Sequence, residues 1–227
     1  MNNIANLKRQ SGNNQEAIDL FKRAIKEDPN LVQAYTRVAA NSLAINDLGQ
    51  AKSFAEQALQ INETTAGVNE ILGIIFQNKN NPTKAIEYYQ REVEIYPLAG
   101  NSLLNQGLLL LQQVQPKAAL ESLAKASAIA PSERCSLLLA QTHQRLGQFK
   151  EAITEYKKLN IYQSNNKHIP FNLGLSLLRI GENNDAIRAF QVAVQIDETF
   201  VDAWGNKGSA HKREGHNKEA LAEQTKL

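Results

Sequence analysis

The chain has 227 residues, of which 42% are hydrophobic, and its 25 basic and 23 acidic side chains leave a net charge of +2 at neutral pH. This balance excludes the strongly basic surface typical of nucleic-acid-binding domains. The single cysteine, Cys135, excludes an internal disulfide and a thiolate zinc site. There is no apolar run long enough for a signal peptide or a membrane-spanning helix, so we expect a cytoplasmic location.

Small residues recur along the chain at intervals of 34 residues, with one interval of 33. The first series is Ala5, Ala39, Gly73, Gly107, Ala140, Gly174 and Gly208, and a second series twelve residues later is Ala17, Ala51, Ala85, Ala119, Ala152, Ala186 and Ala220. Antiparallel helices approach closely where the crossing residue is Gly or Ala. The sequence therefore predicts one array over 1–227 of seven helix pairs, the first and last incomplete, with repeats at about 1–31, 32–65, 66–99, 100–132, 133–166, 167–200 and 201–227.

Helix-ending residues lie between the two small positions of most repeats: Gly12, Asn46 and Asp47, Asn80 and Asn81, Gly147, Gly181 and Gly215. Pro82 and Pro116 are predicted to lie in the first turn of a second helix, where a missing N–H costs nothing. Three further prolines, Pro29, Pro97 and Pro131, are predicted to end second helices. Large apolar residues one turn after the second small position are predicted to join each helix pair to the next: Phe21, Tyr89, Leu123, Tyr156 and Phe190.

This pattern resembles the tetratricopeptide repeat, with a large apolar residue, Leu-Gly, an aromatic residue, Ala, an aromatic residue, Ala and Pro at a period of 34. Good matches are Leu72, Gly73, Phe76, Ala85, Tyr89 and Pro97 in one repeat and Leu173, Gly174, Ala186, Phe190 and Ala193 in another. The sequence departs from the family at several positions, of which Glu92 and Leu159, in place of the usual alanine, are two. The resemblance implies an all-α, right-handed solenoid of antiparallel helix pairs, whose first helices line a concave groove.

The resemblance also implies that this groove binds proteins or peptides, through the second, fifth, sixth, ninth, twelfth and thirteenth residues of each repeat. The predicted peptide-binding residues are Ile71, Ile74, Leu104, Asn105, Leu108, Leu111, Leu137, Gln141, Arg145, His168, Phe171, Asn172, Leu175, Arg179, Asn206, Lys212 and Arg213. Many of them are apolar. An apolar stretch in a groove is typical of an interaction site, but the same side chains would also pack against adjacent repeats.

Three of these residues, Asn105, Asn172 and Asn206, share the sixth position. They are similar to the asparagine ladder of O-linked N-acetylglucosamine transferases, in which side-chain amides grip the backbone of an extended substrate. Here Arg37, Ile71 and Leu138 interrupt the series.

Three arginines, Arg145, Arg179 and Arg213, share the thirteenth position in consecutive repeats. Their guanidinium groups could pair with acidic groups of a ligand, or they could complement the helix dipole from the last turn of a helix. We therefore expect a protein or peptide ligand that combines apolar anchors with acidic groups.

We find no nucleophile with a base, no metal-ligand cluster and no phosphate-binding loop, so we expect neither catalysis nor a cofactor. His143 and His211 are predicted to pack between helices, and the spacing of His211 and His216 across a turn is interpreted as unsuited to a metal. Nucleic acid and membrane are not expected partners. Neither end has a polar capping helix, which suggests end-to-end self-association. Alternatively, the array is the substrate-recognition region of a larger glycosyltransferase or methyltransferase with its catalytic domain beyond Leu227.

Overall fold

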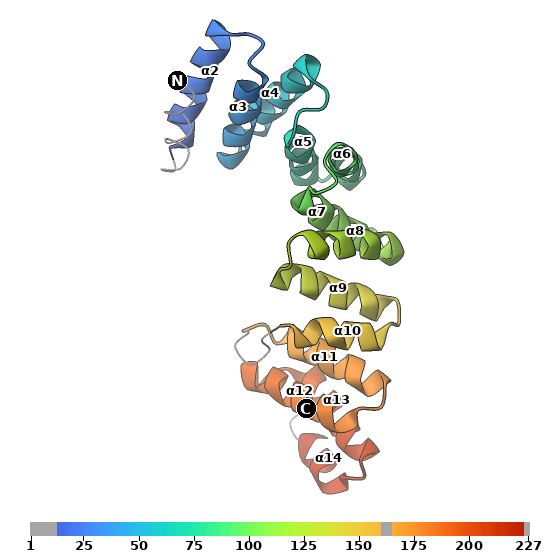
Figure 1. Ribbon diagram of the computed structural model, residues 1–227. Helices are drawn as coiled ribbons and strands as arrows, with labels where there is room; N and C mark the ends of the chain where they lie inside the picture. The colour runs from blue at the N-terminus through green and yellow to red at the C-terminus, as the bar shows by residue number, and fades with distance from the viewer. Residues whose placement is uncertain (1–12, 160–164, 225–227) are drawn as a thin grey trace. The chain divides into compact units, whose positions relative to one another are not determined.

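The computed structural model describes residues 13–159 and 165–224, and within these ranges it contains thirteen α-helices and no β-strand (Figure 1). Along the chain the helices are α2 (Asn14–Glu27), α3 (Val32–Ala44), α4 (Leu48–Ile61), α5 (Val68–Asn78), α6 (Pro82–Ile95), α7 (Gly100–Gln112), α8 (Pro116–Ile129), α9 (Glu133–Arg145), α10 (Phe149–Lys157), α11 (His168–Arg179), α12 (Asn183–Ile196), α13 (Val201–Arg213) and α14 (Asn217–Gln224). The predicted first helix of repeat 1–31 lies outside the described residues.

The chain divides into two compact units, Met1–Leu109 and Leu110–Leu227, which we describe separately. In the first unit each helix from α2 to α6 packs against the next one along the chain. In the second unit the same is true from α8 to α14. This order of neighbours confirms the predicted all-α solenoid of helix pairs. The repeat boundaries and the continuity of the array from one unit to the other stay predictions.

The small residues lie where the two helices of a pair come closest. A Cβ atom built on Gly73 would lie 2.5 Å from a ring carbon of Tyr89, and one on Gly174 would lie 2.6 Å from a ring carbon of Phe190. Both rings are fully buried. The aromatic residue of the second helix thus occupies the space that glycine leaves on the first, because a packed interior has no room for both groups.

Prolines begin and end the second helices as predicted. Pro82 and Pro116 are the first residues of α6 and α8. The other three, Pro29, Pro97 and Pro131, follow the last residues of α2, α6 and α8.

The turn inside each of the six repeats from residue 32 onward is built in the same way. The N–H of the sixteenth residue donates to the carbonyl of the eleventh at 2.8–3.0 Å, in the pairs Asp47–Ser42, Asn81–Phe76, Gln115–Leu110, Gln148–His143, Glu182–Leu177 and His216–His211. The fifteenth residue has a positive φ of 54–83°, and it is Asn46, Asn80, Val114, Gly147, Gly181 or Gly215. This is the Schellman ending of a helix, in which a left-handed residue lets two later N–H groups satisfy otherwise unpaired carbonyls. We call each such turn a closed corner.

Val114 has the same backbone conformation as the other fifteenth residues, but it is the one among the six that is neither glycine nor asparagine. Its φ is 58°. Glycine and asparagine adopt this left-handed conformation at low energy, whereas a β-branched side chain clashes with its own backbone. Its side chain is 79% exposed, so little packing compensates for the strain. No helix-ending residue was recognised in this repeat from its sequence, yet the corner has the same hydrogen bond and left-handed conformation as the others.

Replacing Val114 with glycine is expected to raise the free energy of unfolding of the second unit by about 1 kcal/mol, because the left-handed strain outweighs the extra flexibility of glycine in the unfolded chain. Urea unfolding followed by circular dichroism measures the change. The reciprocal variant Gly147→Val, at the same position of the next repeat, should lower stability. An unchanged or lower midpoint for Val114→Gly would contradict the strain argument.

Candidate functional site

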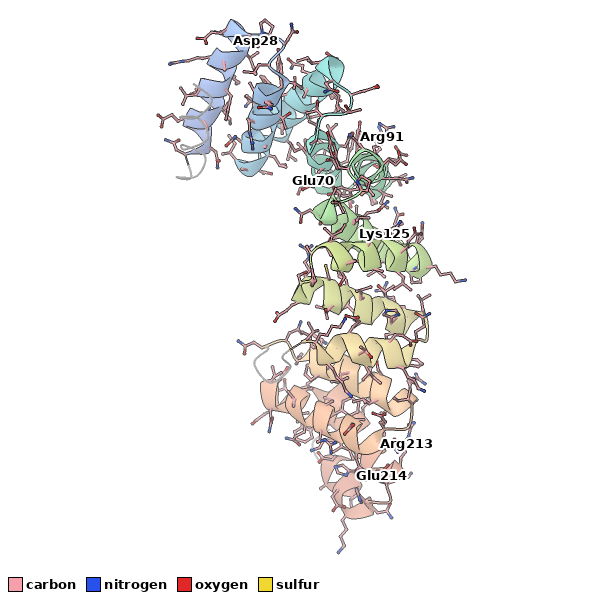
Figure 2. All side chains as sticks on the ribbon, in the orientation of Figure 1. Asp28, Glu70, Arg91, Lys125, Arg213 and Glu214 are labelled. Atoms are coloured by element: carbon pink, nitrogen blue, oxygen red, sulfur yellow. The ribbon has the colours of Figure 1, made fainter. Side chains whose placement is uncertain are left out.

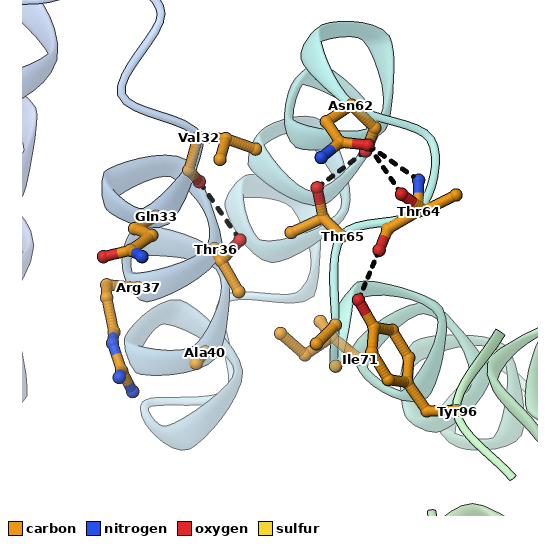
Figure 3. Close-up of a pocket in the computed structure, with 12 residues that line it drawn as sticks. Val32, Gln33, Thr36, Arg37, Ala40, Asn62, Thr64, Thr65, Ile71 and Tyr96 are labelled. Atoms are coloured by element: carbon orange, nitrogen blue, oxygen red, sulfur yellow. Dashed lines mark hydrogen bonds between the residues drawn. The ribbon is translucent and has the colours of Figure 1, made fainter.

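A hollow of about 560 Å³ lies within the first unit, on the face of α3 that the resemblance assigns to the groove (Figure 3). It is lined by Val32, Gln33, Thr36, Arg37 and Ala40 of α3, by Asn62, Thr64, Thr65, Ala66 and Gly67 between α4 and α5, by Ile71 of α5 and by Tyr96 after α6. The α3 residues include the second, fifth, sixth and ninth of their repeat. Ile71 belongs to the predicted contact set, whereas the α3 residues do not, and Arg37 was interpreted from the sequence only as an interruption of the asparagine series.

Hydrogen bonds fix the segment between α4 and α5 that forms the rim of the hollow. The Asn62 side-chain oxygen accepts from the N–H of Thr64 at 3.0 Å and from its hydroxyl at 2.9 Å. The Thr65 hydroxyl donates to the Asn62 carbonyl at 2.6 Å, and the Tyr96 hydroxyl donates to the Thr64 carbonyl at 2.6 Å (Figure 3). A rim held in this way loses little conformational entropy when a ligand binds.

Glu92 supports the same segment from α6. Its buried carboxylate accepts from the N–H of Gly67 at 2.7 Å and from the N–H of Glu70 at 3.3 Å. These N–H groups belong to the start of α5, where no intrahelical acceptor exists and a negative charge is favoured. Burial raises the pKa of the Glu92 carboxyl, and the bonds from Gly67 and Glu70 offset only part of that rise. The resemblance predicts an alanine at this position. Glu92 stands there instead, and its side chain caps the start of α5.

Arg37 is the charged residue of the hollow. Its half-buried side chain forms no hydrogen bond or ion pair with any other residue that the structure describes. Nearby walls are apolar, since Val32, Ala40, Ile71 and the ring of Tyr96 all line the hollow. An unpaired guanidinium beside an apolar wall suits a ligand that carries an anionic group next to an apolar one.

The predicted apolar contact residues are buried or half-buried, and several of them pack between helices. Ile71 and Leu111 are buried, while Ile74 packs against the cluster around Ala85 and Tyr89. In the second unit Leu137, Phe171 and Leu175 are half-buried and pack against its main core cluster. Leu104, Leu108 and Gln141 are half-buried. A ligand contact for these residues stays a prediction.

Two of the predicted ladder asparagines lie against buried tyrosines. The Asn105 amide donates to the hydroxyl oxygen of Tyr89, and that hydroxyl donates to the Gln77 side-chain oxygen at 2.9 Å. The same arrangement recurs in the second unit, where Asn172 donates to Tyr156 and Tyr156 donates to Gln144 at 3.1 Å. Burial raises the pKa of both tyrosines, so their hydroxyls stay protonated.

The third asparagine, Asn206, lies in a repeat where the buried aromatic residue has no hydroxyl. Asn206 follows Phe190 by the same sixteen residues, but phenylalanine has no hydroxyl to bind. Its amide instead donates to the carbonyl of Asp202, one turn back on its own helix, at 2.8 Å. All three amides therefore have an intramolecular acceptor for a donated hydrogen bond.

Two of the three predicted arginines cap the helix of the preceding repeat. Arg145 donates to the Leu111 carbonyl at 2.8 Å, and Arg213, labelled in Figure 2, donates to the Leu178 carbonyl at 3.2 Å. Both carbonyls belong to the last turn of a helix, whose unpaired acceptors favour a cation. Arg179 and Lys212 are exposed.

His168 is exposed and its ring packs edge-on against Phe200, with ring centroids 5.4 Å apart. It borders a second hollow, of about 740 Å³, together with Lys167 and Asp197. Hydrogen bonds from Lys167 and Thr199 lower the pKa of Asp197 to about 2, so this carboxylate stays ionised. Residues 160–164 lie outside the described residues.

Within residues 13–159 and 165–224 no three His, Cys, Asp or Glu side chains gather in an arrangement that could hold a metal. In the same ranges no helix is both long enough and apolar enough to cross a membrane.

Stability should depend on pH through Glu92 in a defined direction. A carboxyl whose pKa is raised by folding stabilises the fold below its unfolded pKa, and this contribution is lost as the pH rises through the folded pKa. The unfolding free energy of the wild type minus that of Glu92→Gln should therefore increase as the pH falls from 7.5 towards 5. Urea titrations at several pH values measure it. The exposed neighbour Glu94→Gln is the control, and a difference that shrinks on acidification would refute the assignment.

Replacing Arg145 with glutamine should remove the bond to the Leu111 carbonyl and lower the unfolding free energy of the second unit by about 1 kcal/mol. Arg179→Gln is the matched control, because the Arg179 side chain makes no hydrogen bond to another described residue. Thermal unfolding of both variants measures the difference. An equal loss of unfolding free energy in the two variants would show that the bond from Arg145 to the Leu111 carbonyl does not stabilise the fold.

The solved structures that are similar to this chain include the following three. A MamA protein is 24% identical with a TM-score of 0.66, over 72% of this chain and 90% of that one. MamA from Desulfovibrio magneticus RS-1 is 18% identical with a TM-score of 0.63, over 70% and 90%. PilF from Pseudomonas aeruginosa is 20% identical with a TM-score of 0.62, over 86% and 90%. These likenesses support the fold.

Comparison with curated proteins gives no match. A family model described as tetratricopeptide repeat matches residues 72–134 and 137–199, and another with the same description matches residues 1–31. The first model alone covers more than half of the sequence, and its matches fall on the helix pairs described above. This chain therefore belongs to the tetratricopeptide repeat family.

Proposed function

We propose that this chain is a protein-interaction scaffold and that it holds a peptide segment of its partner in the hollow beside α3. The observation that carries the proposal is the Arg37 guanidinium, which lines a hollow on the groove-assigned face and has no partner among the described residues. A cation that no internal acidic group neutralises favours an acidic ligand.

The shape of the hollow supports a side-chain anchor beside the acidic group. Its volume of about 560 Å³ falls within the range usual for ligand sites, roughly 300–1,000 Å³. Ile71 and the ring of Tyr96 provide apolar surface, while Gln33 and Thr36 provide polar groups on the same helix face as Arg37 (Figure 3). The proposed ligand is therefore an extended segment with an aliphatic or aromatic residue near an Asp, a Glu or a terminal carboxylate.

The hollow in the first unit is a better acidic-ligand site than the arginine series in the second. Arg145 and Arg213 already donate to helix carbonyls, and a ligand would have to compete with those bonds. Arg37 makes no such bond with a described residue, so a ligand would meet no competing acceptor among these residues. A preorganised rim adds to this advantage, because the segment between α4 and α5 is already fixed by Glu92 and Tyr96.

Selection from a library of random peptides tests the proposal directly. The wild type should enrich peptides with an acidic residue near an apolar one, and their affinity should fall as the salt concentration rises. Arg37→Gln should weaken binding of a selected peptide by about tenfold and flatten its salt dependence. Isothermal titration calorimetry measures both effects.

Two further variants make this test specific. Arg23→Gln removes an exposed cation of α2 that does not line the hollow, so it should leave binding unchanged. Ala40→Arg fills the hollow and should abolish binding, while circular dichroism reports whether the helices remain. Peptides that bind Arg37→Gln as tightly as the wild type would show that this hollow is not the site, and a library without any enriched peptide would count against a peptide-binding scaffold.

A further inference from the structure

The closed corner brings the backbones of two residues together in each of the six repeats from residue 32 onward. The hydrogen bond from the sixteenth N–H to the eleventh carbonyl places these residues side by side, and a contact between them is usual in Schellman endings. In the fifth repeat the pair is His143 and Gln148, whose Nδ1 and Oε1 atoms lie 2.7 Å apart in a good hydrogen bond.

The seventh repeat places two histidines at this corner. The Nδ1 atoms of His211 and His216 lie 3.5 Å apart, and the ring centroids are 5.7 Å apart with an angle of 55° between the planes. The separation is long for an N–H···N hydrogen bond. It is close to the distance between two imidazole nitrogens on one tetrahedral metal ion, which is about 3.3 Å for metal–nitrogen bonds of about 2.0–2.1 Å.

We propose that His211 and His216 form a binding site for a divalent late transition-metal ion of the nickel or zinc type. The two Nδ1 atoms supply two ligands from the protein, and water completes the coordination, since His216 is exposed. Imidazole favours these ions over Mg²⁺ and Ca²⁺, which prefer oxygen ligands. This site would join the last turn of α13 to the residue before α14, so the ion would also stabilise the packing of α14. It is independent of the peptide site proposed above.

The charges around the pair permit a cation. Lys207, one turn before His211, forms an ion pair with Glu223 of α14 at 2.7 Å and a hydrogen bond with Gln191 of α12 at 2.5 Å. Its charge is therefore partly neutralised, while Glu219 and Glu223 favour positive charge on His211. Histidine binds such an ion through the uncharged imidazole, so protons and the metal ion would compete for this pair.

Calorimetric titration of the untagged full chain, freed of metal by a chelator, tests the site. The wild type should bind Ni²⁺ or Zn²⁺ in a 1:1 ratio at pH 7.5, bind more weakly as the pH falls, and show no binding of Mg²⁺. His216→Gln copies the natural His143–Gln148 corner, so it should keep the fold. It should bind at least roughly tenfold more weakly, since removing a second-shell partner alone costs about that much.

The fifth and sixth repeats supply matched controls. His143→Gln and His168→Gln remove the other two histidines and should leave affinity unchanged. Gln148→His rebuilds the histidine pair at an equivalent corner, so it should add a second binding event. The proposal is wrong if millimolar metal produces no binding to the wild type, or if His216→Gln binds as tightly as the wild type.

Discussion

The closed corner is the interaction on which the rest of this structure depends. It ends the first helix of a repeat, satisfies two of its last carbonyls and sets the direction in which the second helix starts. With that direction set, the eighth residue of the first helix always faces the second helix, and only a small side chain fits there. The ring of Tyr89 against Gly73 shows how little space remains. Even Val114 adopts the left-handed conformation of this corner.

Close packing of the helix pairs also decides the role of several polar residues. A tyrosine hydroxyl buried between repeats must find hydrogen-bond partners, and for Tyr89 and Tyr156 these come from a glutamine of the same repeat and an asparagine of the next. The helix ends likewise require partners: Arg145 donates to a carbonyl in the last turn of α7, and Glu92 accepts from an N–H group at the start of α5. Side chains that by position resemble ligand contacts thus link one repeat to its neighbour.

Sequence reasoning predicted the fold well, because a period of 34 with small residues at fixed offsets leaves few alternatives to stacked helix pairs. It also predicted the prolines at the first residues of α6 and α8. It missed the corner at Val114, since that residue carries no turn signal of its own. The hollow beside α3 was missed for a different reason. Arg37 was interpreted as an interruption of an asparagine series, because a sequence shows which face a residue occupies but not which partners its charge finds.

The same limit explains the histidines. His211 and His216 are five positions apart with a turn between them, and this spacing led to the interpretation that the pair is unsuited to a metal. The closed corner joins the sixteenth N–H to the eleventh carbonyl, and in this repeat the two imidazole rings lie close together. The proposed metal site therefore depends on which two residues stand at a corner that recurs in six repeats. At the comparable corner of the fifth repeat, His143 and Gln148 form a hydrogen bond instead. The fold thus sets the backbone geometry of a corner, and the two side chains set its chemistry.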